Sequence, residues 1–316
     1  MTHYSCEVRH RLPRKGLRSA GPQSSTMEDA NASEIDPTAS TSARLNREAF
    51  VGISAGAAAG IGTVARGLGQ GAGLGKTHPP LVAPDDSAIV AAHVELRRPD
   101  GAIAAYAASP KNAGPDTPGI VVVMHIWGVD TSIRDVVRRY AKEGYVAIAP
   151  DLYSRFHAPS GDGVSDIATF RPFAKQLLDA QADADIRAAA NWITAAHPGA
   201  RVGVTGFCMG GAIALRQAIT NGDVFVADAP FYGNPAGIDA GQIRIPICGS
   251  YGARDTSIPA ESVRAFRDAL RVPNDIVIYS TAGHAFFDDQ RGAFDPAAAA
   301  DAWRRTLAFF AKFLRG

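Results

Sequence analysis

A regular alternation of short apolar runs with amphipathic helical segments is the feature that most constrains the fold of this chain. The run 119–125 is almost continuously apolar, which is typical of a strand buried on both faces of a parallel sheet. A turn signal, Pro99-Asp100-Gly101, predicts a hairpin of 91–98 with 102–108. Because strands that alternate with helices form crossover units, the pattern predicts an α/β fold with an open, doubly wound, mostly parallel sheet and helices on both faces. Further strands are expected at 145–149, 201–205, 224–231, 245–251 and 275–280, and helices at 132–143, 173–196, 210–220, 260–270 and 296–314.

Residues 1–85 lack this alternation, and we expect the folded domain to occupy 86–316. Residues 1–45 are rich in Ser, Thr, Ala, Asn and Asp and are predicted to be disordered. Residues 46–85 hold a short apolar run, 51–64, and a linker rich in Gly and Pro. The run is too short for a helix that crosses a bilayer core of about 30 Å, so no stable membrane span is predicted.

The short apolar run leaves the compartment open. Arg47 and Phe50 have the spacing of a twin-arginine export signal, but Glu48 stands where the second arginine belongs. The segment is therefore either a degenerate export signal to the periplasm or a linker in a cytoplasmic protein. Met1 and Met27 are both candidate start residues.

The charge and the cysteine content of the chain limit the kinds of ligand and partner that it can bind. The chain has 32 Lys and Arg against 31 Asp and Glu, and this balance gives no electrostatic footprint for nucleic acid or an anionic membrane. Cys6, Cys208 and Cys248 are too few and too scattered for a disulfide framework or a CxxC metal site. We therefore expect a small-molecule substrate, without a metal or other cofactor. Cys248 lies in an apolar run and is interpreted as a core residue.

Cys208 lies in a different context, within Gly206-Phe207-Cys208-Met209-Gly210-Gly211. This segment joins a predicted strand to a predicted helix and has the form of a nucleophile elbow with Cys in place of Ser. The glycines are expected because side chains there would collide with neighbouring backbone on a tight turn. The turn would present the Cys208 sulfur at the positive end of a helix, which favours a thiolate.

An acid and a base follow in the order that this kind of elbow requires. Asp255 comes shortly after the strand predicted at 245–251, and His284 after the strand predicted at 275–280. Functional groups of doubly wound sheets lie just past the carboxyl ends of strands, so the three side chains are expected to meet. In that arrangement His284 takes the thiol proton and later protonates the leaving group, while Asp255 orients His284 and stabilises its charged form.

The part of the chain from about Asp86 onward resembles the dienelactone hydrolase family of the α/β-hydrolase fold. That resemblance implies hydrolysis of a small carboxylic ester or lactone through an acyl-enzyme intermediate, with no cofactor. It also implies that Arg155 helps to hold a substrate carboxylate, with Tyr153 and Phe286 among the substrate-binding residues. The matching segments are the elbow, Gly252-x-x-Asp255-x-x-Ile258-Pro259, Gly283-His284-x-Phe286, Ile133-Arg134-Asp135 and residues 144–155, including Pro150-Asp151-Leu152-Tyr153-x-Arg155.

Acyl transfer also needs donors to the developing oxyanion. In this fold they are the backbone N–H groups of the residue after the nucleophile and of a residue after the third strand. They correspond to Met209 and Ile126, with Trp127 expected to form a wall of the pocket.

Two departures from the family pattern bear on the substrate. His125 stands where family members that open dienelactone carry a Glu, and a second Arg expected after the catalytic His is replaced by Phe287, Asp288 and Asp289. His125 either favours the thiolate of Cys208 or hydrogen-bonds backbone at the strand end. With one Arg missing and two carboxylates near the pocket mouth, we expect neutral esters and lactones to be hydrolysed at least as well as anionic ones.

Other functions stay open at this point. The same triad is compatible with a thioesterase or a peptidase, which differ in how strongly the leaving group must be protonated. A binding or redox-sensing domain in which Cys208 is oxidised or inert is a non-enzymatic alternative. Metal ligation by His125, Cys208 and His284 has no supporting spacing.

Overall fold

The computed structural model of the chain describes residues 77–316. The predictions of disorder, of the apolar run and of the linker before residue 77 therefore lie outside the described residues, and so does the question of export. None of the helices within residues 77–316 has the length and apolar character that a membrane crossing requires.

The described residues form an eight-stranded sheet in the order β1-β2-β4-β3-β5-β6-β7-β8. β1 (Ile89–Arg98) and β2 (Gly101–Pro110) form the antiparallel hairpin predicted around Pro99-Asp100-Gly101, and β2 also pairs antiparallel with β4 (Val146–Pro150). The remaining strands pair in parallel, so the predicted mostly parallel α/β sheet is confirmed. They are β3 (Gly119–Val123), β5 (Val202–Phe207), β6 (Phe225–Phe231), β7 (Ser250–Gly252) and β8 (Val277–Tyr279).

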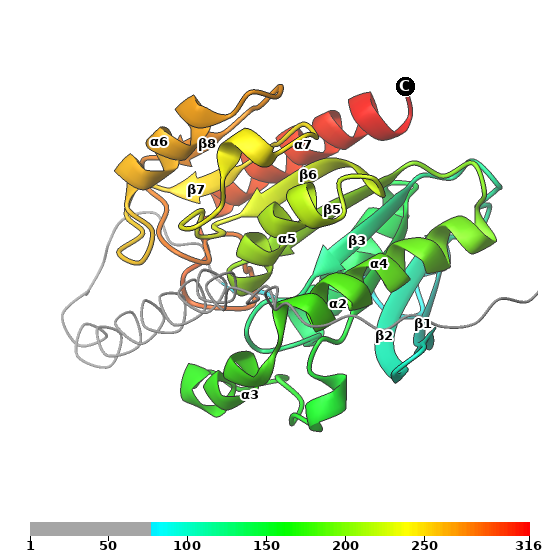
Figure 1. The fold of residues 1–316 in the computed structure, drawn as a ribbon. Helices are drawn as coiled ribbons and strands as arrows, with labels where there is room; N and C mark the ends of the chain where they lie inside the picture. The colour runs from blue at the N-terminus through cyan, green and yellow to red at the C-terminus, as the bar shows by residue number, and fades with distance from the viewer. Residues whose placement is uncertain (1–76) are drawn as a thin grey trace, which may run out of the picture. The chain divides into compact units, whose positions relative to one another are not determined.

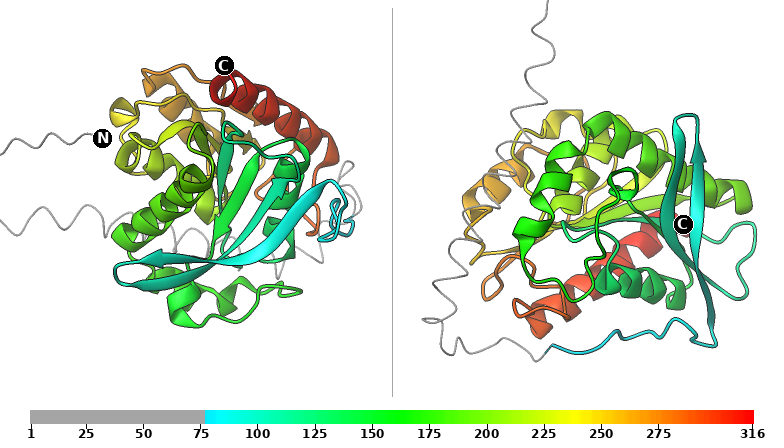
Figure 2. Two further views of the ribbon diagram at one scale, coloured as in Figure 1. Left: turned by 90° about the vertical axis from the view of Figure 1, so that its right-hand side faces the viewer. Right: turned by 90° about the horizontal axis from the view of Figure 1, so that it is seen from below.

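Helices cover both faces of this sheet (Figures 1 and 2). A Cβ atom on Gly119 would meet Ile193 of α4 (Asp179–Ala196), and one on Gly203 would meet Phe310 of α7 (Pro296–Leu314). Because Gly119 pairs with Val202, the neighbouring Gly203 faces the other side, and α4 and α7 must lie on opposite faces. The other helices are α2 (Thr131–Lys142), α3 (Arg171–Gln176), α5 (Met209–Thr220) and α6 (Ala260–Ala269).

The two helical layers are built differently. Tyr140 of α2 packs on Trp303 and Phe310 of α7, with ring centroids 4.6 and 6.1 Å apart, so these two helices share one face. On the other face, Arg216 of α5 joins α4 through an ion pair with Asp179 at 2.9 Å. Parallel strands covered in this way leave their carboxyl ends at one edge, where the site lies.

Two predicted elements need correction. The single helix predicted at 173–196 is wrong, because the chain is extended at Leu177 (φ −66°, ψ 111°) and again at Leu178, which divides it into α3 and α4. The break buries Leu177, and it places Asp179 in the first turn of α4, where the helix dipole favours an acidic side chain. The strand predicted at 245–251 is also shorter than expected. Pro246 has no N–H to donate, and two isolated bridges of Ile247, with Asp228 and Asn274, precede β7.

Candidate active site

Cys208 lies on a tight turn between β5 and the first residue of α5. Its backbone has φ 56° and ψ −115°, a strained conformation for a residue with a side chain, which typically costs about 1–3 kcal/mol. The flanking glycines are required: a Cβ on Gly206 would lie 2.1 Å from the Gly210 carbonyl oxygen, and one on Gly210 would lie 2.3 Å from that of Val123. The elbow therefore packs directly against the end of β3.

The structure brings Cys208, His284 and Asp255 together in one hydrogen-bonded chain. His284 Nε2 lies 3.1 Å from Cys208 Sγ, and His284 Nδ1 lies 2.6 Å from Asp255 Oδ2. The other carboxylate oxygen of Asp255 accepts hydrogen bonds from the backbone N–H groups of Ser257 and Ile258, at 2.8 and 3.1 Å. These bonds fix the carboxylate so that its free oxygen faces the imidazole.

The electrostatics of this chain favour a thiolate paired with an imidazolium. Burial alone would raise the pKa of the Cys208 thiol, but His284, together with His125 and the Met209 backbone N–H, outweighs burial and lowers that pKa. Burial alone would lower the pKa of His284, whereas the Cys208 thiolate and the hydrogen bond with Asp255 raise it to about 10. Both shifts act in the direction of a Cys208 thiolate beside a protonated His284.

Of the two positions expected for oxyanion donors, Met209 lies beside the sulfur. Met209 is the first residue of α5, and its backbone N–H is hydrogen-bonded to the Cys208 sulfur. Ile126 is buried in the loop that follows β3, the strand paired in parallel with β5. Because Val123 pairs with Gly206, this loop and the elbow leave the sheet at the same edge.

Comparison with known proteins assigns the family. The model of the dienelactone hydrolase family matches residues 103–314. The chain belongs to the dienelactone hydrolase family. It is therefore an α/β-hydrolase of the carboxylic ester and lactone hydrolase class.

Two relatives and a more distant structure illustrate the likeness. A Salmonella typhimurium protein with the provisional name carboxymethylenebutenolidase is 38% identical over 270 residues, which cover 75% of this chain and 97% of that protein. A Klebsiella pneumoniae structure provisionally assigned as a dienelactone hydrolase is 36% identical, with a TM-score of 0.66, and covers 72% of this chain and 100% of its own. A dienelactone hydrolase-like promiscuous phosphotriesterase from metagenomic libraries is 26% identical, with a TM-score of 0.62 and the same coverages.

Three of the residues predicted to bind substrate lie near the elbow or near His284. Trp127 and Tyr153 lie near the elbow: the Tyr153 hydroxyl contacts Met209 Sδ at 3.5 Å, and the Trp127 ring packs edge-on against His125. Phe286 is fully buried and packs against Tyr232 behind His284, so it supports the catalytic loop instead of lining an open pocket.

Arg155, expected to hold a substrate carboxylate, is engaged elsewhere. Its guanidinium forms a two-point ion pair with the fully buried Asp185 and lies 3.8 Å from Asp100. Arg98 binds the same Asp185 carboxylate. The resting structure therefore pairs Arg155 with a protein carboxylate and does not bring it to the triad.

The expectations for the loop after His284 need correction. Asp288 and Asp289 were expected to add negative charge near the pocket mouth, but they are only 5% and 4% exposed and are paired with Arg291 and Arg139. An arginine, Arg291, lies further along this loop and binds Asp130 and Asp288. Its guanidinium stacks 3.7 Å from the Trp127 ring centroid.

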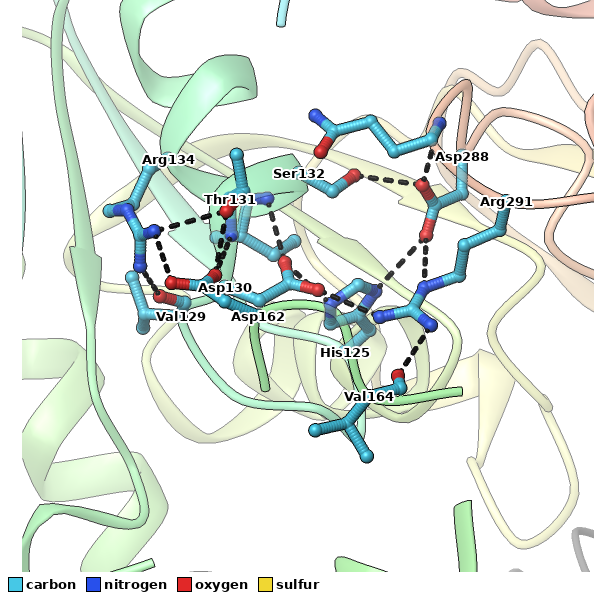
Figure 3. A network of polar contacts seen from close by, with 12 residues as sticks. His125, Val129, Asp130, Thr131, Ser132, Arg134, Asp162, Val164, Asp288 and Arg291 are labelled. Carbon is cyan, nitrogen blue, oxygen red and sulfur yellow. Dashed lines mark hydrogen bonds and ion pairs between the residues drawn. The ribbon is translucent and has the colours of Figure 1, made fainter. Parts of the chain in front are cut away.

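His125 lies at the centre of a group of charged residues that includes Asp288 and Arg291 (Figure 3). Its Nε2 lies 2.9 Å from Asp130 Oδ1, and its Nδ1 lies 3.6 Å from Asp288 Oδ2. Arg291 bridges the same two carboxylates, at 2.9 Å to Asp130 and 3.1 Å to Asp288. Asp288 also accepts a hydrogen bond from Ser132 at 2.9 Å. We call His125, Asp130, Asp288 and Arg291 the His125 cluster.

Sequence reasoning missed Asp130 and Arg291 as parts of the site. Asp130 has the form of an ordinary helix N-cap, and it does cap α2 by accepting a hydrogen bond from the Ile133 N–H. Arg291 follows His284 along the chain, and this proximity was the only signal in the sequence. Its partner Asp130 is 161 residues away, so the pairing arises only from the fold.

Proposed function

We propose that this hydrolase cleaves a small carboxylic ester or lactone through a Cys208–His284–Asp255 triad and an acyl-enzyme intermediate. The observation that carries the proposal is the hydrogen-bonded chain from Asp255 through His284 to a cysteine on a strained elbow. A thiolate, an imidazolium and an orienting carboxylate at these distances are what nucleophilic acyl transfer requires.

The first half of the reaction forms a thioester on the enzyme. The Cys208 thiolate attacks the carbonyl carbon, and the backbone N–H groups of Met209 and Ile126 stabilise the resulting oxyanion. When the tetrahedral intermediate collapses, the C–O bond to the leaving group breaks, and the alkoxide takes the proton from His284 Nε2. With a lactone as substrate, the new alcohol stays attached to the acyl chain.

The second half restores the enzyme. Neutral His284 removes a proton from water, and the resulting hydroxide attacks the thioester carbonyl at the same oxyanion site. Collapse expels the Cys208 thiolate and releases the carboxylic acid, so the proton that His284 has gained pairs with the thiolate again. Asp255 keeps the imidazole oriented and stabilises its charged form in both halves.

Intact-mass measurement during turnover of p-nitrophenyl acetate tests this proposal. The unmodified enzyme should carry one acetyl group that peptide mapping locates on Cys208, and Cys208→Ala should lose the adduct and slow hydrolysis by about a thousandfold or more. Cys248→Ala is the matched control, because Cys248 is fully buried elsewhere in the core and should be dispensable for both measurements. Hydrolysis by Cys208→Ala near the parent rate, or an adduct on another residue, would contradict the proposal.

Coupling between triad members gives a second test. His284→Ala added to Cys208→Ala should cause little further loss, because the residues act as one unit. Fully additive losses would mean that the two residues act independently. Comparing acetyl thioester, ester and amide substrates then defines the class of bond that is cleaved fastest.

A further inference from the structure

His125 and Cys208 leave the sheet at the same place. Val123 of β3 pairs with Gly206 of β5, and each of the two side chains lies two residues beyond its member of this pair. A Cβ on Gly210 would lie only 2.3 and 2.4 Å from the carbonyl oxygens of Val123 and Met124, so the elbow and the end of β3 are in direct contact. His125 is therefore a neighbour of the nucleophile from a different strand.

The contacts of His125 fit its charged form. The side chain is 4% exposed, and each ring nitrogen faces a carboxylate, Asp130 on one side and Asp288 on the other. A neutral imidazole has a single N–H and cannot donate toward both carboxylates, whereas an imidazolium can. Carboxylates close to both ring nitrogens therefore favour a positive charge on the ring through charge attraction.

The charge balance of the cluster leads to the same conclusion. Asp130 and Asp288, each 4% exposed at the side chain, carry two negative charges, and Arg291 supplies one positive charge. A neutral His125 would leave one buried negative charge uncompensated, which is costly in a low-dielectric interior. A charged His125 balances the cluster.

We propose that His125 is a positioning residue that carries a permanent positive charge beside Cys208 and keeps the nucleophile as a thiolate in the resting enzyme. The inference rests on the proposed role of Cys208 as nucleophile. His125 does not take part in proton transfer, because its ring nitrogens lie beside carboxylates and His284 already contacts the sulfur.

Each element packed around His125 contributes a charged or ionisable group that affects the pKa of His125. They are Asp130 at the start of α2, Cys208 at the start of α5, and Asp288 and Arg291 in the loop after His284. Burial alone would lower the pKa of His125, but Asp130 and then Asp288 outweigh both burial and Arg291, so the pKa is raised. His125 in turn contributes to the lowered pKa of Cys208, after His284.

The test is the pH dependence of Cys208 alkylation by iodoacetamide, followed by mass spectrometry of the peptide that contains Cys208. Because the thiolate is the reacting form, the midpoint of the rate profile reports the ionisation of this thiol. In the unmodified enzyme the midpoint should fall below the value of about 8.5 for a free cysteine. His125→Gln should raise it by about one pH unit or more, since one unit corresponds to about 1.4 kcal/mol of lost charge interaction.

Two further variants separate charge from structure. His125→Lys keeps the positive charge and should leave the midpoint close to that of the unmodified enzyme. His93→Gln is the matched control, because His93 is exposed on β1 and packs on Tyr106, away from the cluster. A purely structural role for His125 would change the thermal midpoint of unfolding but not the alkylation midpoint.

These measurements test the inference even if one variant fails to fold. It is overturned by a midpoint at or above about 8.5 in the unmodified enzyme, by an unchanged midpoint in folded His125→Gln, or by a rise of about one unit in folded His125→Lys. Alkylation does not depend on hydrolysis. A Cys208→Ala enzyme that still hydrolyses esters defeats the proposed function, whereas an essential Cys208 whose midpoint ignores His125 defeats only this inference.

Discussion

Two arginines that are already ion-paired with aspartates allow a prediction of the substrate charge that this hydrolase prefers. Arg291, whose guanidinium stacks on the Trp127 ring, already binds Asp130 and Asp288, and Arg155 is paired with Asp185. A substrate carboxylate must compete with these protein carboxylates for a guanidinium. We therefore expect a neutral ester or lactone to be hydrolysed at least as efficiently as a carboxylated dienelactone.

The magnitude follows from the lost contact. A hydrogen bond between charged groups contributes about 1.5–3 kcal/mol, and about 1.4 kcal/mol corresponds to a tenfold change in kcat/KM. For an anionic substrate that lacks such a contact, kcat/KM should therefore be about ten- to a hundredfold lower than it would be with a free arginine. The kcat/KM of its methyl ester should not change. Asp288→Asn removes one competitor for Arg291, so the ratio of acid to ester should rise by about tenfold.

The assay compares kcat/KM for a free-acid lactone and its methyl ester at low and moderate salt, with the unmodified enzyme and Asp288→Asn. Taking the ratio cancels effects of Asp288→Asn on the nucleophile that both substrates share. Asp223→Asn controls for the general change in charge, because Asp223 is exposed and pairs with Arg187 on the surface. A strong preference of the unmodified enzyme for the acid, abolished by Arg155→Ala, would refute the reasoning and show that the Arg155–Asp185 pair opens for the substrate.

Three further measurements probe the ionisable groups. The serine variant Cys208→Ser should be far slower than its parent, since an alcohol is much harder to ionise than a thiol of pKa about 8.5, and equal rates would exclude thiolate chemistry. The kcat/KM of a neutral ester should fall on the alkaline side near pH 10, where His284 loses the proton that the leaving group takes, and an alkaline limb near neutrality would contradict this assignment. Asp228 is fully buried on β6, neither carboxyl oxygen has a hydrogen-bond partner among the described residues, and burial raises its pKa well above the ordinary value. At pH values below the unfolded pKa of about 3.9, Asp228 is neutral in both states and the fold keeps its full stability. As pH rises from there through the folded pKa, the free energy of unfolding falls by about 1.4 kcal/mol per pH unit. Asp228→Asn should thus gain stability over the parent at pH 8 but not at pH 4 in urea unfolding, and identical pH dependence of the two proteins would count against a buried neutral carboxyl.

The fold was predictable from the sequence because strands buried on both faces produce continuous apolar runs. Residues 120–124 are such a run, and they are fully buried in β3 and the residue after it. The errors arose where tertiary contacts decide the backbone. Leu177 and Leu178 are ordinary helix formers, and the extended backbone there goes with burial of Leu177 and ion pairing of Asp179, which local propensity does not reveal.

The candidate site was predictable to a different extent. Cys208, Asp255 and His284 could be named because each follows its own strand, in an order that the topology brings to one edge. The His125 cluster could not be foreseen, because its members pair across the fold. A local interpretation predicted an exposed charge at Asp288. In the structure Asp288 is buried, accepts a hydrogen bond from Ser132, 156 residues away, and forms an ion pair with Arg291.

The His125 cluster also connects the loops that the proposed reaction requires to hold fixed positions relative to one another. Asp130 belongs to the loop that carries Ile126, Asp288 follows His284, and Arg291 joins both while hydrogen-bonding the Val164 carbonyl at 2.8 Å. Removing one partner of a buried ion pair typically costs about 3–5 kcal/mol, although apolar side chains of similar volume often stabilise a fold as well. Stability alone therefore does not account for four charged side chains at this position. What apolar packing could not supply is the pair of ion contacts through which Arg291 joins Asp130 to Asp288. The cost of the buried charges fits the proposed reaction, which requires the loop of Ile126, His284 and the charge beside Cys208 to hold one arrangement.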